Sequence, residues 1–594
     1  MGYSEIACQI CGMSFNIGRI RTLTEPRSSG WDYSGYSTGG FIRRHSKSSR
    51  FCPPSSGCMV VVRGPVKAPE CAIADDEEDD DYVHRPSAEL DPYEYDSHHE
   101  SEPENDTTDG DDDTRSCSSG ASETYRAFVQ SLASPAAHPE VMIPEHDAPE
   151  DEAMTYEHIA GGPACEWNRH SYVEGAFNGH AISVEEMRGC TTLQCFVPKD
   201  DDWESGSDDQ EFETSGKFFL SGLSDHSPSR DMAWPSVYPS RHDCDQPCAD
   251  NSFYDTKAAE EHAMPFHPTC LEVFKRASIL RSGAVDYEGL INWWLIEAGD
   301  QFYKFPRDPA VNNEQWFQHV AGNEFVAANP CFGTKLESIL AASDRTGDPG
   351  FAYDTPVFGA LHSTSDDVFA RLPRERCLMI LDHLESRDIA NLRLASRSFY
   401  HLPQSLFRSL TLREMPWLWE AWCTLGYSKW AYHMASELCR RIEQHDEVIN
   451  IIHQAENILR EEAYTVQDEG LHQAAIHALQ QAAADEEDER DYPSRPAPLQ
   501  AAKKTDWYRL RCELARNRTR LLGLRNRRRI WTDCEEILDR IARYRGEGTM
   551  TLGQMVDARE VAEAADRQRI EENRRWGNYC QVGRPGNYNY DDWA

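Results

Sequence analysis

The sequence has no long apolar run. Its longest uninterrupted apolar stretches, such as 58–62 and 293–296, are far shorter than the about 20 residues that a helix needs to cross a bilayer. The N-terminal residues include charged and polar groups but no apolar segment of signal-peptide length, which argues against secretion. We therefore expect a soluble protein of the cytoplasm, the nucleus or both, without a membrane partner.

Recognisable catalytic motifs are also missing. The sequence contains no phosphate-binding loop, no dinucleotide-binding fingerprint, no HExxH and no nucleophile elbow. Internal repeats with the periods of solenoids or propellers are absent as well. These absences argue against an enzyme and against two common repeat architectures for binding surfaces, so we expect a non-catalytic protein.

Positive charge is scarce, and both signs are unevenly distributed. The 594 residues include 60 Lys and Arg against 101 Asp and Glu, a formal net charge of −41. Residues 75–115 hold 19 acidic and 2 basic side chains, whereas residues 503–545 hold 14 basic and 6 acidic ones. The overall acidity disfavours nucleic acid as a partner, so any such binding is expected only at the basic segment.

The acidic segment also lacks the residues that build a core. Between 74 and 155 the sequence is rich in Asp, Glu, Ser and Pro and poor in branched apolar residues. Such a composition cannot bury enough surface to offset the loss of chain entropy on folding. We predict a disordered acidic insertion within a folded unit.

The remaining sequence predicts an α+β protein of several domains. Mixed, loop-rich composition before 340 gives way to helix-favouring residues after 365. The predicted division is a Cys-rich N-terminal segment at 1–73, the insertion at 74–155, the rest of a mixed, loop-rich N-terminal domain at 156–340, a linker at 341–364, a three-helix module at 365–412, a C-terminal helical region at 413–545 and a flexible tail at 546–594.

The cysteines indicate a metal site. Nineteen cysteines, an odd number without a secretion signal, are better explained as thiols or metal ligands than as a disulfide framework. Cys8 and Cys11 have the spacing of a zinc knuckle, and Gly12 can adopt the positive φ that the turn of such a knuckle often needs. His267 and Cys270 are spaced like the second pair of LIM-type or treble-clef sites, whose last ligand opens a helix. We therefore predict a structural zinc site of Cys8, Cys11, His267 and Cys270, with no open coordination position.

Other cysteines form weaker groupings. Their spacings are poor metal signatures, and the favoured interpretation is that each packs as a small apolar side chain. These groupings are Cys52 with Cys58, Cys190 with Cys195, and Cys244 with Cys248 and His242.

Residues 366–402 have the pattern of a compact group of short helices. Pro373 stands where a helix begins, a position at which its missing N–H has no bond to lose. Apolar residues at helical spacing, a break at 386–388 and a second apolar face follow. A unit of this size cannot bury its apolar residues alone, so we expect it to need a partner.

This stretch resembles the F-box, a small helical module that docks on the Skp-family adaptor of cullin-RING ubiquitin ligases. The resemblance is carried by Leu372, Pro373, Glu375, Ile380, Leu384, Asp388, the run LRLASR at 392–397, Phe399 and Leu402. It implies an adaptor contact made by Leu372, Pro373, Ile380, Leu381, Leu384 and Leu392. Cys377 and Phe399 depart from the family pattern, because many members have a larger aliphatic residue and a Trp at these places.

Further segments, among them ISVEEMRGC, PFHPTCLEVFKR and LRNRRRIW, are similar to poorly characterised fungal F-box proteins with an N-terminal Cys-rich region. The resemblance implies a substrate-recognition subunit that links an unknown target protein to a Skp-cullin-RING ubiquitin ligase through the adaptor. Such a subunit does no chemistry itself, since the ligase acts by holding the target near an activated thioester.

Three other interpretations stay open. The helices at 366–402 can be an ordinary hairpin of the protein's own core, because amphipathic pairs are common. Residues 503–545, with Trp507, Tyr508 and Trp531 among clustered arginines, can bind nucleic acid in a zinc-stabilised protein. The apolar residues of this segment recur at helical spacing, however, and favour a core helix. The protein can also be a non-catalytic scaffold that binds neither adaptor nor nucleic acid.

Overall fold

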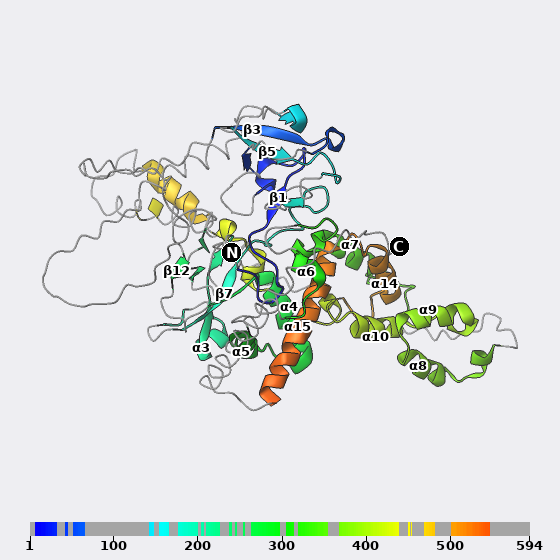
Figure 1. Ribbon diagram of the computed structural model, residues 1–594. Coiled ribbons are helices and arrows are strands. Elements are labelled where there is room, and N and C mark those ends of the chain that lie inside the picture. The colour runs from blue at the N-terminus through cyan, green and yellow to red at the C-terminus, as the bar shows by residue number, and fades with distance from the viewer. Residues whose placement is uncertain are drawn as a thin grey trace, which may run out of the picture.

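The computed structural model shows a protein of mixed helices and small sheets (Figure 1). It describes residues 6–31, 42–44, 52–65, 142–147, 154–165, 176–199, 203–206, 209–225, 237–239, 244–245, 253–255, 263–297, 305–313, 319–353, 367–438, 450–451, 453, 469–480 and 500–546. Most of the predicted insertion, part of the predicted linker, the predicted tail beyond 546, and Cys248 and His242 lie outside these residues. Among the described helices, none combines the length and apolar character that a membrane span requires.

The longest helix among the described residues, α15 (Leu522–Gly546), belongs to the main core. It packs on α4 (Pro268–Ser282), α5 (Tyr287–Glu297) and the short helix η5 (Glu324–Ala327), and Figure 1 shows it beside α4 and α5. Apolar residues at helical spacing form its buried face, namely Ile530, Trp531, Cys534, Ile537, Leu538 and Ile541. The prediction of a core helix in the basic segment is thus confirmed, with a break between α14 (Trp507–Arg516) and α15.

Helix α4 is enclosed by the rest of the main core. It begins at Pro268, directly after its N-cap residue His267, and ends at Gly283, whose φ of 82° is the left-handed conformation favoured at helix ends. Every residue from 268 to 278 is buried, as expected for a helix surrounded on all sides. Two charged residues of this buried stretch, Arg276 and Glu272, form an ion pair with each other (2.6 Å).

A three-stranded antiparallel sheet closes one side of this core. Its central strand β7 (Gln194–Pro198) pairs with β13 (Met264–Phe266) and β8 (Phe218–Leu220). Short α3 (Glu211–Ser215) precedes β8. Because β13 runs directly into α4, the sheet determines where the first turn of α4 lies.

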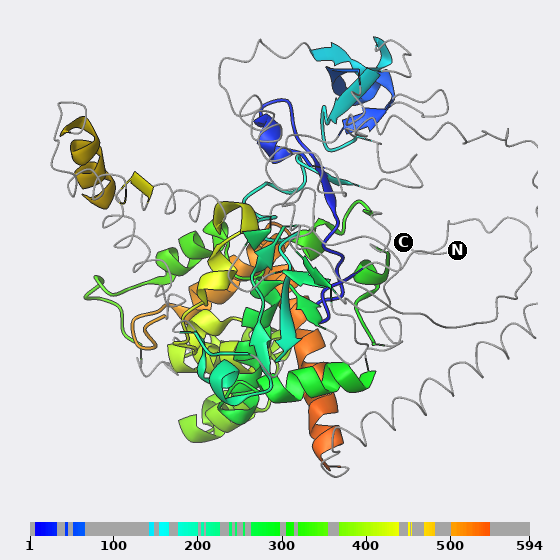
Figure 2. The same cartoon turned by 90° about the vertical axis from the view of Figure 1, so that its left-hand side faces the viewer.

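A four-stranded antiparallel sheet lies apart from the helices around α15, at one end of the molecule (Figures 1 and 2). Its order is β2 (Ile42–Arg44), β5 (Met154–Ile159), β3 (Met59–Pro65) and β4 (Met142–Pro144). Strand β4 and the start of β5 fall within 74–155, so the predicted disordered insertion is wrong at its C-terminal end. The acidic composition of the whole window concealed a short apolar strand, Met142-Ile143, that pairs with β3.

A second core holds the helices around 366–402. We call residues 367–414 the helical module, which comprises η6 (Val368–Arg371), α8 (Arg374–Asp382), α9 (Ser386–Ala395), η7 (Arg397–Phe399) and α10 (Gln404–Glu414). Its core continues into α7 (Thr334–Ser343) and α14. Figure 1 shows α8 and α9 at the periphery, on the far side of α10 from α15.

The structure also contains smaller elements. They are β1 (Gly18–Ile20) paired in parallel with β6 (Ala176–Asn178), β9 (Leu223–Ser224) with β11 (Cys244–Asp245), β10 (Val237–Pro239) with β12 (Phe253–Asp255), the helices α6 (Pro309–Asn313) and α11 (Lys429–Tyr432), and the 3-10 turns η1 (Arg27–Ser29), η2 (Pro54–Ser56), η3 (Glu145–Asp147) and η8 (Trp419–Ala421).

Candidate functional site

The first half of the predicted metal site is a tight turn in the N-terminal segment. The N–H of Cys8 donates to the carbonyl of Met13 (2.9 Å), and the N–H of Gly12 donates to the carbonyl of Cys8 (2.7 Å). Gly12 has a φ of 80°, which residues with a side chain rarely adopt. The N–H of Cys11 points at Sγ of Cys8 (3.4 Å), as in a metal-binding knuckle.

The second half is the junction between β13 and α4. His267 is the N-cap residue of α4, and Cys270 lies in the first helical turn. The N–H of Gln9 donates to the carbonyl of Pro265 (2.9 Å), and the N–H of His267 points at Sγ of Cys8 (3.4 Å). These bonds hold the two halves together although His267 and Cys8 are 259 positions apart.

The four side chains converge on one point. Nδ1 of His267 lies 3.4 Å from Sγ of Cys11 and 3.7 Å from Sγ of Cys270. All four donor atoms lie within 4.8 Å of one another, and each of the four residues is at most 4 % exposed. Sulfur ligands about 2.3 Å from a tetrahedral zinc lie about 3.8 Å apart, so these separations suit such an ion. The structure therefore brings together the four residues that the sequence singles out.

Hydrogen bonding fixes the tautomer of His267. Its Nε2 lies 2.9 Å from the carbonyl oxygen of Cys190, which can only accept a hydrogen bond. The proton therefore sits on Nε2, and the lone pair of Nδ1 faces the three sulfurs. A ligand histidine whose second nitrogen donates to a carbonyl is the usual arrangement at structural zinc sites.

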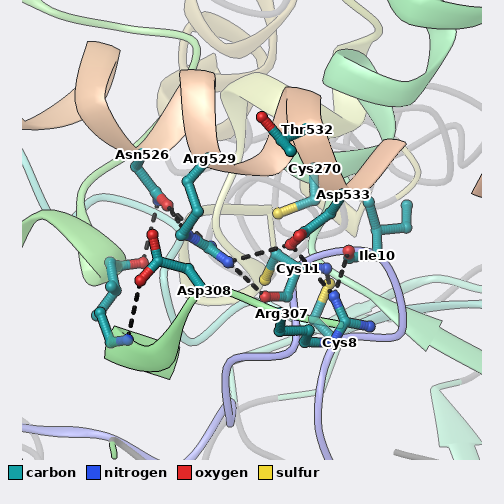
Figure 3. Close-up of polar contacts among 12 residues, drawn as sticks. Cys8, Ile10, Cys11, Cys270, Arg307, Asp308, Asn526, Arg529, Thr532 and Asp533 are labelled. Carbon is teal, nitrogen blue, oxygen red and sulfur yellow. Dashed lines mark hydrogen bonds and ion pairs between the residues drawn. The ribbon is translucent and has the colours of Figure 1, made fainter. Parts of the chain in front are cut away.

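Two buried arginines hold the backbone of the N-terminal turn (Figure 3). Arg307 donates to the carbonyls of Gln9 (2.7 Å) and Ile10 (2.8 Å), and Arg529 of α15 donates to the carbonyl of Cys11 (2.7 Å). Sequence reasoning missed both arginines, because no local pattern indicates which arginine will bind a backbone turn that is distant in the sequence. Three successive carbonyls of the turn are thus bound by side chains from distant parts of the chain.

Asp533 completes the charge balance beside this turn. Its Oδ2 lies 3.3 Å from Nη1 of both Arg307 and Arg529. Burial raises the pKa of Asp533 to about 6, against the opposing effect of the two guanidiniums. Burial also disfavours a Cys11 thiolate, but hydrogen bonds with Cys270 and Cys8 hold the pKa of Cys11 well below its usual value. Three thiolates around a divalent ion, together with Asp533, would balance the two arginine charges.

The arrangement suits a structural ion. Four protein donors complete a tetrahedral shell and leave no coordination position for water or substrate. The centre joins the N-terminal segment, α4 and α15, all of which belong to the main core. Such an ion would therefore attach the N-terminal turn to elements that lie far away in the sequence.

The helical module places the six predicted adaptor-binding residues in three environments. Leu372, which is 38 % exposed, and Pro373 lie at the surface before α8. Ile380, Leu384 and Leu392 are half-buried. Leu381 is fully buried within the second core, so its assignment to a contact surface is wrong. Helical spacing put Leu381 on an apolar face, but that face turns toward the protein's own core.

The helical module also carries exposed apolar side chains that the sequence analysis did not select. The structure leaves Val368, Met379, Leu394 and Tyr400 between 53 % and 89 % exposed. The two departures from the family pattern, Cys377 and Phe399, are instead buried inside the module. They affect its internal packing and not its surface. Burial of this kind depends on the tertiary fold and has no local signal.

The helical module is fastened to the rest of the protein by a polar contact. Arg511 of α14 donates to Glu414 of α10 (2.5 Å), and the same carboxylate accepts from the N–H of Ser386 (3.0 Å) at the start of α9. Burial raises the pKa of Glu414, but the bonds from Ser386 and Arg511 outweigh it and lower that pKa. One carboxylate therefore joins α9, α10 and α14.

Most arginines of the basic segment that could contact nucleic acid are occupied within the protein. Arg527 is buried against Glu420 (2.9 Å), Arg540 pairs with Glu297 (2.6 Å), and Arg545 pairs with Asp286 (2.6 Å). The aromatic rings of Trp507 and Trp531 are buried as well, so neither offers a face for base stacking. Tyr508 is 40 % exposed and its ring lies against that of Phe407. These contacts favour the interpretation of the segment as core.

The described residues contain a second Cys/His group that can hold a metal ion. It combines Cys52 and Cys58, which the sequence analysis paired but interpreted as packing residues, with His158 and Cys165, which it did not consider. The separations of these residues along the chain match no common metal motif, so sequence alone offered no signal.

Comparisons with known proteins leave the family open. No family model matches the chain, and no solved structure matches it. A mitochondrial ATP-dependent RNA helicase, mss116 of Aspergillus oryzae, is 42 % identical over 50 residues. The match covers 8 % of this chain and 8 % of the helicase, so the chain spans a small fraction of that relative.

Proposed function

We propose that the protein is an F-box-type substrate-recognition subunit that links a target protein to a Skp-cullin-RING ubiquitin ligase. The proposal begins from the sequence resemblance at 366–402. It is supported by a group of short helices at that place, with Leu372 and Pro373 exposed ahead of α8. The protein would do no chemistry itself, because the ligase transfers ubiquitin to a target held nearby.

The observation that carries the proposal is the exposure of apolar side chains on the helical module. Val368, Leu372, Met379, Leu394 and Tyr400 are all at least 38 % exposed within a short stretch of chain. Scattered single apolar residues are ordinary, but several large ones on one small module are typical of a surface that another protein covers. An adaptor with an apolar groove is the partner that the resemblance implies.

The position of the module also suits this role. Helices α8 and α9 lie at the periphery, while α10 and α14 attach them to the body (Figure 1). The contact of Arg511 with Glu414 would hold the adaptor-bound helices in a constant orientation to the main core. The main core or the four-stranded sheet would then present the target.

We also propose that the ion held by Cys8, Cys11, His267 and Cys270 is zinc. Three thiolates and one imidazole in a closed tetrahedral shell are a common structural zinc set, whereas calcium and magnesium prefer oxygen ligands. The orientation of His267 by the Cys190 carbonyl supports this identity.

The docking proposal is tested with a purified Skp-family adaptor. The full chain is expected to co-elute with the adaptor in size-exclusion chromatography, and Leu372→Asp combined with Pro373→Ala is expected to weaken binding at least tenfold. Leu23→Asp is the matched control, since Leu23 is 42 % exposed but lies outside the module. Failure of the unaltered chain to bind the adaptor, or equal loss in the control, would remove the proposal.

A further inference from the structure

The second Cys/His group lies where the four-stranded sheet begins. Cys52 and Cys58 flank η2, immediately before β3, while His158 lies on β5 and Cys165 follows that strand. Strand pairing sets Val60 of β3 opposite His158. The antiparallel register thus carries His158 and the chain after it back to the two cysteines that precede β3.

The four donor atoms of this group lie within 4.8 Å of one another. Nε2 of His158 is 3.2 Å from Sγ of Cys165 and 4.0 Å from Sγ of Cys52. Sγ of Cys52 and Sγ of Cys165 are 3.8 Å apart. This distance is far from the about 2.05 Å of a disulfide bond but equals the about 3.8 Å between two sulfurs on a tetrahedral zinc.

A buried carboxylate orients the histidine toward the sulfurs. Oε1 of Glu145, a residue that is 2 % exposed, lies 3.5 Å from Nδ1 of His158, and its Oε2 accepts from the N–H of Cys52 (3.1 Å). A carboxylate behind the non-ligating nitrogen of a histidine is a recurring second shell of zinc sites. The N–H of Gly161 also points at Sγ of Cys58 (3.5 Å), a contact typical of bound thiolates.

The apolar clusters beside the sheet are small. Among the residues described there, the buried apolar side chains form two small groups, Ile20, Cys52, Cys58, Ala160 and Ala176 in one and Val60 and Tyr156 in the other. Cores of this size give little stability, and small folds commonly rely on a metal instead. The ligands Cys52 and His158 are 106 positions apart, so an ion would also close a long loop.

We propose that Cys52, Cys58, His158 and Cys165 bind a second structural zinc ion. This ion would link the segment that precedes β3 to β5 and the residues after it, and so stabilise the four-stranded sheet. The residue types are the same as in the first centre, although His158 presents Nε2 and His267 presents Nδ1, and the ion would again have no open position. The two groups share no residue, so a substitution in one group removes no ligand from the other.

The test is the zinc content of the full chain, measured by elemental analysis after dialysis against a weak chelator. We expect two zinc ions per unaltered chain and one per chain in Cys165→Ser. Cys512→Ser is the matched control, because Cys512 is half-buried like Cys165 but belongs to neither group, and it should keep two ions. Cys8→Ser combined with Cys11→Ser should lose the ion of the first centre.

Titration with cobalt gives a second readout, which does not depend on how much zinc stays bound to the protein during purification. In the unaltered chain, the thiolate-to-cobalt absorption band should increase until two equivalents of cobalt have been added. In Cys165→Ser, the band should reach half of this intensity. The proposal is overturned if the unaltered chain holds a single ion that disappears in the Cys8, Cys11 variant. It is also overturned if Cys165→Ser and Cys512→Ser hold equal amounts, or if the second ion is iron or copper.

Discussion

The two Cys/His groups consist of the same residue types, three cysteines and one histidine, but have different surroundings. In the first, all four ligands are buried within the main core, and Arg307 and Arg529 bind the carbonyls of the ligand turn. In the second, Cys165 is half-buried and the adjoining apolar groups are small. Metal ions bound at the two groups would therefore serve two different structural purposes.

The difference teaches that the effect of removing an ion depends on what surrounds it. Loss of the first ion would leave three thiols and two guanidiniums inside a core that cannot solvate them. Loss of the second would release a small sheet that lies apart from the main helices (Figure 2). We expect a global effect at the first centre and a local one at the second.

The largest effect is expected from Cys8→Ser combined with Cys11→Ser. Removing half of a buried metal site should cost about 5 kcal/mol or more, which is enough to unfold many domains. Thermal unfolding followed by tryptophan fluorescence reports it, because Trp294 and Trp531 are buried in the same core. Cys423→Ser, in the same core but outside the metal group, is the control. An unchanged midpoint would contradict a supporting role of the first centre.

The next largest effect is expected from Arg529→Met. This substitution removes the buried guanidinium that contacts the Cys11 carbonyl and Asp533. We therefore expect the free energy of unfolding to fall by about 3–5 kcal/mol. Arg528→Met is the control, since Arg528 is exposed and should change stability by less than about 0.5 kcal/mol. Equal effects of the two substitutions in denaturant titrations would show that the arginine does not support the turn.

A local effect is expected from Cys165→Ser. Amide hydrogen exchange of β3 and β5 should accelerate about a hundredfold, while amides of α4 and α15 keep their protection. The reason is that the second centre contacts the sheet and not the main core. Mass spectrometry of proteolytic fragments measures this. Faster exchange throughout the protein would mean that the two regions unfold together.

The smallest effect is expected from Glu145→Gln. The amide keeps the size of the side chain but orients His158 less strongly, so zinc affinity at the second centre should fall by about tenfold to a hundredfold. Competition with a chromogenic chelator measures the affinity. Asp147→Asn, at an exposed carboxylate nearby, should leave it unchanged. If Glu145→Gln instead lowered the zinc affinity of the first centre, the assignment of Glu145 to the second centre would be wrong.

Sequence reasoning located the first centre because each of its halves has a local signal. Cys8 and Cys11 lie on one turn, and His267 and Cys270 lie at one helix start, so short spacings encode both pairs. The second centre has no such signal. Cys58 and His158 approach one another only because β3 and β5 pair in a particular register, and register is a property of the folded sheet.

Burial within the helical module shows the same limit. Helical spacing predicted which residues share a face, and α8 and α9 form where the sequence placed helices. It did not predict that Leu381 faces inward, because α7 and α14, distant in sequence, complete the core around it. The docking of an adaptor on the exposed residues remains our proposal.

By itself, the sequence determined the helix-forming segments, the apolar periodicity of α14 and α15 and the two halves of the first metal centre, all of which depend on neighbouring residues. Only the tertiary structure decided the rest. One core joins residues of the C-terminal region 413–545 to those of 1–73 and 156–340, which the sequence analysis had assigned to a separate N-terminal domain. Contacts between distant segments depend on the packing of whole faces, and no local pattern records which faces will meet.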